Sequence, residues 1–374
     1  MKKLQSVRIV TADVKKEKSN LRSVIVSHTF TEYLEIISLG ENLTEEQAMD
    51  AMKQILEGRV SGEEVAAFLM GMRAKGETVT ELTGFVRQMR EEAVNVDVDT
   101  GGAVDLCGTG GDKSGTFNIS TAAMFVVAGT GVPVLKHGNR SVSSKSGSFD
   151  VLEELGAAAN LQKDQTEALF NETGMAFMFA PNFHPALKYV MPARKALKLR
   201  TFFNMLGPLL NPADVRNQVI GAFSKDAAAH MIQILGNLQT ESAFTLSSHD
   251  GLDEVSLTSQ SEIFELKSHL SRGATTFDPR SLGYELVEPE ELLGGDAKVN
   301  AEIIRSILNG SSTEAQRNIV EMNAAFAVHV SGAAGTLEEA KARAEKSLDS
   351  GEAEKKLNLF VKESKKVENL VNKQ

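Results

Sequence analysis

The fold class that the sequence predicts is α/β, with a small helical domain ahead of a larger α/β domain that contains a mainly parallel central sheet. Apolar residues recur at helical spacing from Thr31 to Val94. After residue 100, short apolar runs alternate with glycine-rich turns and apolar helices, which predicts a parallel sheet. At 374 residues the chain is long enough for two hydrophobic cores.

The helical domain is expected to be an antiparallel bundle of short helices. Thr44 and Gln47 form a capping-box pattern ahead of an apolar helical face. A second helix is expected over Glu63–Ala74, and a third is expected to begin at Thr80. The connections are short, as in helical bundles.

We expect three parts along the chain: an extension at 1–30, a small helical domain at 31–99 and a large α/β domain at 100–374. The segment 179–212 holds five of the eight prolines. Its part at about 182–204 is expected to return to the helical domain and to act as a hinge.

The larger domain is expected to alternate strands with helices, and its last part is expected to be mostly helical. The predicted strands are 103–107, 132–135, 219–222 and 243–247. The predicted helices are 118–129, 151–155, 227–238, 300–308 and 313–330, followed by a charged C-terminal helix with Leu357, Leu359, Phe360 and Val367 facing inward.

Composition excludes several classes of protein. The net charge of −10 argues against nonspecific nucleic-acid binding as the main activity. No apolar run is long enough for a membrane span or a secretory signal. Cys107 is the single cysteine, which excludes an internal disulfide and a multi-cysteine metal cage. We interpret Cys107 as a core residue and expect a cytoplasmic protein.

A glycine-rich loop, Gly108–Asp112, lies between an expected strand and an expected helix. Glycines let backbone amides approach an anion, and the helix adds the positive end of its dipole. Asn118, Ser120 and Thr121 stand in the first helical turn, where they can cap the helix or bind phosphate. The spacing fits neither a Walker loop nor the dinucleotide fingerprint. The alternative is a tight turn capped by Asn118.

A basic polar loop, Lys136–Ser148, follows the second expected strand. Its thirteen residues include three cations, five serines and two glycines. Lysine and arginine neutralise phosphate, and ligands bind at the carboxyl ends of strands in open parallel sheets. Both loops are therefore expected at the same edge of the sheet. The alternative is a solvated flexible loop.

Three further candidates lie outside these loops. Asp253 and Glu254 are adjacent carboxylates beyond a strand and can share Mg²⁺, or can form an exposed acidic turn. Arg194 can hold a carboxylate in a bidentate fork, or can make a surface salt bridge. His184, in a proline-flanked segment, is interpreted as structural.

Five segments in this order resemble the anthranilate phosphoribosyltransferase family. The segments are Gly108–Asp112 with Thr116–Thr121 (GTGGD and TFNIST), Lys136–Ser148 (KHGNRSVSSKSGS), Phe202–Ala213 (FFNMLGPLLNPA), Gly251–Thr258 (GLDEVSLT) and Gly294–Gly310 (GGDAKVNAEIIRSILNG). The resemblance covers nearly everything from Thr31 to the C-terminal helix. Phe149 and Ser141 depart from it, because the family often has a small residue and an alanine there.

The resemblance implies an active site in the interdomain cleft, a homodimer and a role in tryptophan biosynthesis. It implies that the phosphoribosyl group of phosphoribosyl pyrophosphate is transferred to the amine of anthranilate, with Mg²⁺ as cofactor. The implied donor-binding residues are Gly108, Gly111, Asp112, Thr116, Asn118, Ile119, Ser120, Thr121, Lys136, His137, Gly138, Asn139, Arg140, Ser143, Ser144 and Ser148. Gly108, Asn139 and Arg194 are implied for anthranilate, and Ser120, Asp253 and Glu254 for metal.

The expected chemistry is stabilisation of the leaving pyrophosphate, and Lys136 is the side chain expected to supply positive charge. The anthranilate amine is already nucleophilic, so no general base is assigned. Two other functions remain open: a nucleoside phosphorylase of the same superfamily, and a noncatalytic relative that binds nucleic acid. No nucleic-acid or membrane partner is expected.

Overall fold

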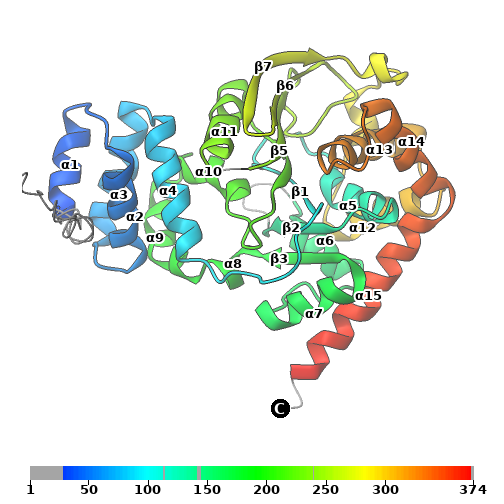
Figure 1. Cartoon of the computed structure of the whole chain (residues 1–374), viewed down its shortest axis with the longest axis horizontal. Helices are drawn as coiled ribbons and strands as arrows, with labels where there is room; N and C mark the ends of the chain where they lie inside the picture. The colour runs from blue at the N-terminus through cyan, green and yellow to red at the C-terminus, as the bar shows by residue number, and fades with distance from the viewer. Residues whose placement is uncertain (1–27, 113, 141–144, 239, 372–374) are drawn as a thin grey trace, which may run out of the picture.

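The computed structural model describes residues 28–112, 114–140, 145–238 and 240–371. For residues 370 and 371 it describes the backbone alone. A small helical domain lies beside a larger α/β domain (Figure 1), which confirms the predicted fold class. The expectations for residues 1–27 fall outside this part of the chain. No helix in the described ranges is both long and apolar enough to cross a membrane.

Each helix of the helical domain begins at a polar capping residue. The helices are α1 (Phe30–Ser38), α2 (Glu45–Leu56), α3 (Gly62–Lys75) and α4 (Val79–Glu91). Thr44 caps α2 and accepts from the amide of Gln47 at 3.2 Å, as predicted. The start of α4 was predicted wrongly, because Thr78 caps it rather than Thr80. Thr78 has Glu81 three residues later to complete a capping box, whereas a cap at Thr80 would be followed by Thr83.

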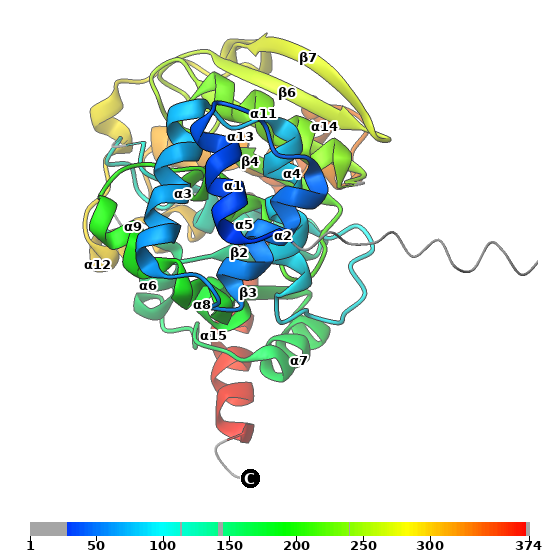
Figure 2. The same ribbon diagram turned by 90° about the vertical axis from the view of Figure 1, so that its left-hand side faces the viewer.

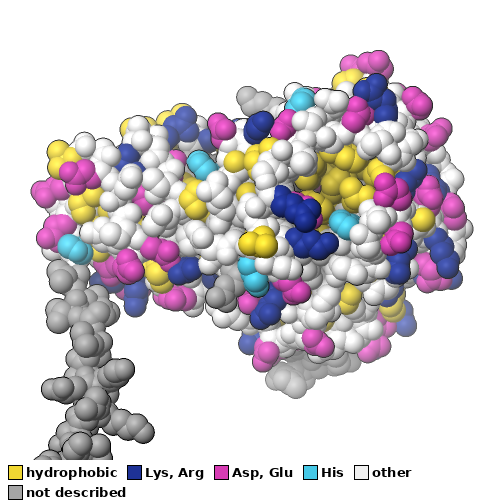
Figure 3. Space-filling model, turned by 45° about the horizontal axis from the view of Figure 1, so that its top comes forward, with side chains coloured by type: hydrophobic (Ala, Val, Ile, Leu, Met, Phe, Trp, Pro, Cys, Tyr) yellow, Lys and Arg dark blue, Asp and Glu magenta, His cyan; other side chains and the backbone are white. Residues whose placement is uncertain are grey.

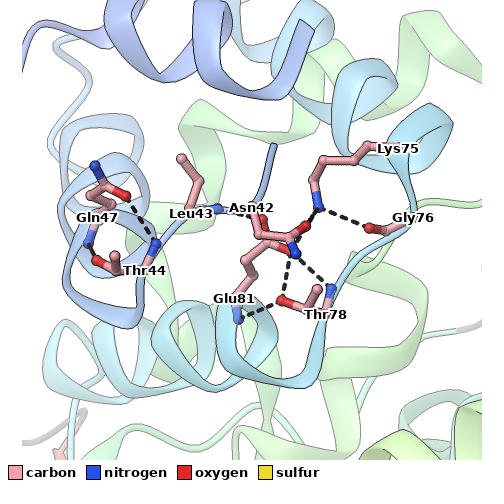
Figure 4. Close-up of polar contacts among 8 residues, drawn as sticks. All are labelled: Asn42, Leu43, Thr44, Gln47, Lys75, Gly76, Thr78 and Glu81. Carbon is pink, nitrogen blue, oxygen red and sulfur yellow. Dashed lines mark hydrogen bonds and ion pairs between the residues drawn. The ribbon is translucent and has the colours of Figure 1, made fainter. Parts of the chain in front are cut away.

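A buried ion pair joins the ends of these helices (Figure 4). Nζ of Lys75 lies 2.9 Å from Oε2 of Glu81, and both side chains are almost fully buried. The same Nζ contacts Asn42 Oδ1 at 2.8 Å, and Glu81 Oε1 accepts from the amide of Leu43 at 2.9 Å. Because both charges have several hydrogen-bond partners, the pair is well compensated for its burial.

The larger domain is built on one seven-stranded sheet in the order β3-β2-β1-β4-β5-β6-β7. The strands are β1 (Val104–Gly108), β2 (Val134–Gly138), β3 (Met175–Phe179), β4 (Asn217–Gly221), β5 (Ser242–Ser248), β6 (Ser261–Lys267) and β7 (Leu270–Phe277). The first five strands in that order are parallel, and β6 and β7 are antiparallel. Strand β3 was not predicted. Strands β6 and β7 were not predicted either, so the expectation that the last part is mostly helical was incomplete.

Helices cover both faces of the sheet. They are α5 (Ile119–Gly129), α6 (Ser148–Glu154), α7 (Lys163–Thr173), α11 (Lys225–Asn237), α12 (Ala297–Leu308), α13 (Glu314–Val330), α14 (Leu337–Asp349) and α15 (Glu352–Val371), with short 3₁₀ turns η3 (Pro279–Leu282) and η4 (Pro289–Leu292). One core cluster contains α5, α13 and α15, a second joins α11 to the helical domain, and a third, smaller one lies around β3. On α15, Leu357, Phe360 and Val367 are buried as predicted, but Leu359 is only partly buried.

The chain between β3 and β4 runs back to the helical domain. It forms α8 (Ala180–Phe183), η1 (Pro185–Tyr189), α9 (Met191–Leu197), α10 (Phe203–Leu206) and η2 (Gly207–Leu209). Helix α9 lies beside α3 (Figure 2), and the ring of Phe202 stacks on Phe85 with centroids 4.7 Å apart. These contacts support the domain division 31–99 with 182–204, which we retain as a proposal.

Candidate active site

The glycine-rich loop, the basic strand end and the acidic turn meet at one place. The amide of Gly110 donates to Oδ2 of Asp253 at 2.6 Å. The amide of Ser120 donates to Oε1 of Glu254 at 3.2 Å, and Nζ of Lys136 lies 3.2 Å from Oγ of Ser120. The first two contacts join segments more than 100 residues apart in sequence, and all three belong to one polar centre at the carboxyl ends of the parallel strands.

Two glycines at strand ends make room for the acidic turn. A Cβ atom at Gly108 would lie 2.3 Å from Oδ2 of Asp253. A Cβ atom at Gly221 would lie 1.5 Å from the backbone oxygen of the same residue. The turn therefore passes directly over β1 and β4, and only glycine fits beneath it.

The adjacent carboxylates are not an exposed acidic turn. Asp253 is 8% exposed and Glu254 is partly buried. Burial raises the pKa of Asp253, and the nearby carboxylate of Asp112 raises it further. Burial and the charge of Asp253 also raise the pKa of Glu254, against the opposing effect of Lys136. Each carboxylate therefore resists ionisation on its own, and a bound cation would favour the charged form of both.

The loop that carries this pair is held rigidly from below. Asn323 on α13 accepts from the amide of Val255 at 3.0 Å and donates to its carbonyl at 2.9 Å. The hydroxyl of Ser248 donates to the carbonyl of Glu254 at 2.7 Å. Asp250 accepts from the hydroxyl of Ser256 at 2.5 Å. These contacts hold the backbone of the turn that presents the two carboxylates.

Lys136 is the buried cation of this centre. It lies on β2, is 2% exposed, and also donates to the backbone carbonyl of Leu106 on β1. Among the described residues it makes no direct ion pair with a carboxylate. Its charge therefore acts on the whole centre rather than being neutralised by one partner.

The remaining predicted residues of the first loop surround the start of α5. The carboxylate of Asp112 accepts from the hydroxyl of Ser114 at 2.6 Å, and that hydroxyl lies 3.1 Å from Oγ1 of Thr116. Ile119 and Thr121 are buried at the helix start. Asn118 does not cap α5 through its side chain, so the interpretation as a simple capped turn is wrong. Gly110 and Gly111 have positive φ angles, which explains why both positions are glycine.

The basic loop is described in part. Oγ of Ser148 donates to the carbonyl of Asn139 at 3.3 Å, and a Cβ atom at Gly138 would lie 2.4 Å from that Oγ. Arg140 pairs with Asp150 at 2.6 Å and lies 4.0 Å above the ring of Phe149. Phe149, where the family often has a small residue, is therefore buried, and its ring supports Arg140. Ser143 and Ser144, with Ser141, lie outside the described residues.

His137 and His184 form a buried pair on the far side of β2. Their ring centroids are 5.3 Å apart, and Nε2 of His184 lies 2.8 Å from the carbonyl oxygen of Leu210. Burial lowers the pKa of His137 to about 3 and that of His184 to about 4. Both are therefore neutral near pH 7, which agrees with the structural interpretation of His184 and makes His137 unsuited to be a cationic phosphate ligand.

Arg194 lies on α9, in the chain between β3 and β4. Its guanidinium carbon is 5.3 Å from the ring centroid of Phe203. Within the described part of the chain it has no carboxylate partner, so the salt-bridge alternative is wrong. Burial lowers its pKa. A partly buried guanidinium without a partner is suited to hold a carboxylate from a ligand.

Sequence reasoning missed several side chains that organise the site. Asp105, buried in β1, accepts from Nδ2 of Asn211 at 2.8 Å. This bond anchors the chain between β3 and β4 to the sheet. Burial raises the pKa of Asp105 to about 6, while Lys136 acts in the opposite direction. Arg200 donates to the carbonyl of Gly111 and lies over the ring of Phe223. An acidic residue inside a short apolar run is the sequence signal that could have identified Asp105.

Two family models match the chain. The α/β domain of a glycosyl transferase family matches residues 100–354, and the helical bundle domain of a glycosyl transferase family matches residues 31–93. An anthranilate phosphoribosyltransferase from Salinibacter ruber is 46% identical over 342 residues, which cover 89% of this chain and 97% of that protein. The chain belongs to the anthranilate phosphoribosyltransferase family.

Further members of the family agree in sequence and in structure. The enzyme from Moorella thermoacetica is 46% identical over 86% of this chain and 94% of its own length. The crystal structure from Thermus thermophilus has a TM-score of 0.83 at 35% identity, covering 89% of this chain and 99% of that one. A Saccharomyces cerevisiae structure in complex with PRPP and Mg has a TM-score of 0.83 at 25% identity, covering 90% and 98%. The family resemblance found in the sequence is therefore confirmed.

Proposed function

We infer that this chain is an anthranilate phosphoribosyltransferase. It transfers the phosphoribosyl group of phosphoribosyl pyrophosphate to the amine of anthranilate and releases pyrophosphate, a step of tryptophan biosynthesis. The single observation that carries this inference is the contact of the glycine-rich loop with the buried acid pair, in a chain that belongs to this family. The geometry unites an anion-binding loop, a cation and a place for metal.

The donor would bind where the two loops meet. The supporting features are the positive-φ glycines, the start of α5 and the buried ammonium of Lys136. The proposed contacts are those expected from the family resemblance: Gly108, Gly111, Asp112, Thr116, Asn118, Ile119, Ser120, Thr121, Lys136, Gly138, Asn139, Arg140, Ser148 and, through its backbone, His137. Arg140 would have to share its guanidinium between Asp150 and a phosphate.

Mg²⁺ fits the acidic turn. Within the described ranges there is no group of three or more His, Cys, Asp or Glu that could hold a metal. Two adjacent carboxylates are nevertheless sufficient for Mg²⁺, which keeps several waters and bridges to substrate phosphates. Asp253 and Glu254 would hold one ion, and Ser120 would offer its hydroxyl oxygen to another. Bound Mg²⁺ would help to neutralise the pyrophosphate.

Anthranilate would lie with its carboxylate at Arg194 and its amine toward the sugar. The guanidinium, which has no carboxylate partner among the described residues, and the adjacent ring of Phe203 support this placement. Asn139 and the strand end at Gly108 would complete the acceptor side. Holding the carboxylate aims the neutral amine, and positioning is what this nucleophile needs.

The reaction breaks the bond between the anomeric carbon and pyrophosphate, and forms a bond from that carbon to nitrogen. Lys136 would stabilise the charge that develops on the leaving group, because a buried cation acts strongly at low dielectric. The amine loses one proton after attack, to water or to a nearby phosphate oxygen. No described side chain is assigned as its general base.

We further propose a cytoplasmic homodimer. Helix α1 lies on the outside of the helical domain, with Leu34 and Ile36 only partly buried and Leu39 74% exposed just after it. Leu34 and Ile36 also pack against the core of the helical domain, so Leu39 is the exposed apolar side chain of this region that a second copy would cover. Light scattering on the purified protein would test the assembly, and a monomer at micromolar concentration would contradict it.

The inferred activity is tested by the loss of anthranilate fluorescence. Loss is expected only with phosphoribosyl pyrophosphate and Mg²⁺ both present. No loss at saturating concentrations of all three would overturn the inference. Phosphorolysis of uridine or thymidine would instead indicate a nucleoside phosphorylase. Nucleic-acid binding is disfavoured, because acidic side chains are spread among the basic ones over the face in Figure 3.

A further inference from the structure

The segment just before α12 forms a backbone clasp on residues 115–117, which lead from the glycine-rich loop into α5. Thr116 and Leu293 form an antiparallel bridge. The amide of Gly294 donates to the carbonyl of Gly115 at 2.9 Å, and the amide of Phe117 donates to the carbonyl of Leu292 at 3.3 Å. These bonds fix the path of the chain into α5, although the two segments are far apart in sequence.

The clasp brings Asn300, near the start of α12, against Asn118 at the start of α5. Asn300 is 2% exposed. A Cβ atom at Gly294 would lie 2.6 Å from Cα of Phe117 and 2.5 Å from Oδ1 of Asn300, so only glycine allows this approach. Helix α12 lies beside α5 and α6 in Figure 1, and it packs against both.

Asn300 stands in the middle of a chain of hydrogen bonds with one fixed direction. The amide of Gly295 donates to Oδ1 of Asn300 at 2.7 Å. Nδ2 of Asn300 donates to Oδ1 of Asn118 at 2.9 Å, and Nδ2 of Asn118 donates to the carbonyl of Ser146 at 3.3 Å. Because a backbone amide begins the chain and a backbone carbonyl ends it, neither asparagine can be turned over without losing bonds.

This direction decides what Asn118 offers to a ligand. Its carbonyl oxygen is occupied by Asn300, and its side chain does not cap α5. Its amide group is therefore directed toward the basic loop at Ser146. An N–H donor stabilises phosphate oxygens, whereas a carbonyl oxygen in the same place would repel them.

We propose that Asn300 is a positioning residue for the phosphoribosyl donor, acting through Asn118. It holds the amide of Asn118 in the donating orientation and sets the spacing between the two loops. The proposal rests on the proposed function, in which Asn118 contacts the donor. Asn300 itself lies behind Asn118 and contacts no substrate.

The test is Asn300→Asp in the full-length protein. In this variant one carboxylate oxygen can still accept from the amide of Gly295. The other oxygen replaces the Nδ2 group that donates to Asn118, and it cannot donate. Asn118 must therefore turn its amide toward the new carboxylate and its carbonyl oxygen toward the basic loop. We expect KM for phosphoribosyl pyrophosphate to rise roughly tenfold, because a hydrogen bond to a charged group is lost. KM for anthranilate should change less than about twofold.

Asn309→Asp is the matched control. It makes the same change at the other end of α12, where the exposed residue only accepts from Ser311. Both Michaelis constants should keep their wild-type values in this variant. Thermal unfolding of each variant shows whether the fold is retained, and Asn300→Ala, which leaves Asn118 free to turn, replaces Asn300→Asp if the aspartate variant does not fold.

A double-mutant cycle with Asn118→Ala separates positioning from simple destabilisation. In the Asn118→Ala background, Asn300→Asp should add almost nothing to KM for the donor. A full additional effect there, an equal rise in both Michaelis constants, or an unchanged donor KM would overturn the positioning role. Wild-type protein that consumes no anthranilate would instead overturn the proposed function, so the two failures are distinct.

Discussion

Gly108, at the end of β1, lies directly against the side chain of Asp253, and a Cβ atom on this glycine would stand 2.3 Å from Oδ2. The amide of Gly110, two residues later, donates to that same oxygen at 2.6 Å. The end of the strand and the start of the loop therefore both depend on where this carboxylate lies.

Gly108→Ala should displace Asp253 and lower kcat/KM by about 100-fold, because small misplacements in an active site are costly. Overpacking should also lower the free energy of unfolding by about 1–3 kcal/mol. The fluorescence assay and urea unfolding measure the two effects. Gly62→Ala is the control, because Gly62 opens α3 and a Cβ atom there would have nothing within 4 Å. Full activity in Gly108→Ala would contradict the close contact.

Arg194→Ala should raise KM for anthranilate by about 10- to 100-fold, since a charge-assisted pair with the substrate carboxylate is lost. KM for phosphoribosyl pyrophosphate should change little. Initial rates at varied concentrations of each substrate measure both constants. The exposed neighbour Lys195→Ala is the control and should resemble wild type. Equal damage to both constants would show that Arg194 has another role.

His184 should make the protein less stable in acid. Its pKa is lowered to about 4 by burial, so the unfolded chain binds a proton between pH 6.5 and 4 that the folded chain does not. The contribution of this residue to stability is therefore present above pH 6.5 and is lost as the pH falls toward 4. His184→Gln should reduce the pH slope of the unfolding free energy there by up to about 1.4 kcal/mol per pH unit. Urea unfolding at several pH values measures the slope, and an identical slope in the variant would refute the assignment.

Lys198→Gly should stabilise the protein by about 0.5–1 kcal/mol. Lys198 ends α9 at a φ of 52°, a left-handed conformation that is costly for residues with a Cβ atom. Thermal or urea unfolding measures the gain. Lys195→Gly, inside the same helix, should instead destabilise by about 0.5–1 kcal/mol. If both variants lose stability equally, the left-handed backbone at Lys198 does not destabilise the protein.

Local patterns in the sequence were sufficient for most of the helices and for the loops of the site. Capping residues such as Thr44 mark helix starts, and glycines after short apolar runs mark strand ends. The hairpin of β6 and β7 escaped prediction because its two turn residues, Ser268 and His269, have φ values of 50° and 66°. Asparagine and glycine usually mark that turn, so the sequence lacked the ordinary signal.

Contacts between distant segments could not be predicted in the same way. Nothing near Asn300 in sequence shows that it meets Asn118, and nothing near His184 shows that it meets His137. Both contacts exist because strands and helices that are remote in sequence become neighbours in the folded protein. The sequence could name chemically suitable residues, but only the fold could show which of them face one another.

The return segment places Arg194 on α9, a short helix between loops, whereas the groups around Asp253 come from closely packed strand ends. Substitutions on α9 can therefore accumulate without disturbing the sheet edge. A lineage could exchange one aromatic amine for another nucleophile while retaining the same sugar diphosphate. Laboratory evolution toward new acceptors would accordingly begin with libraries on this one helix.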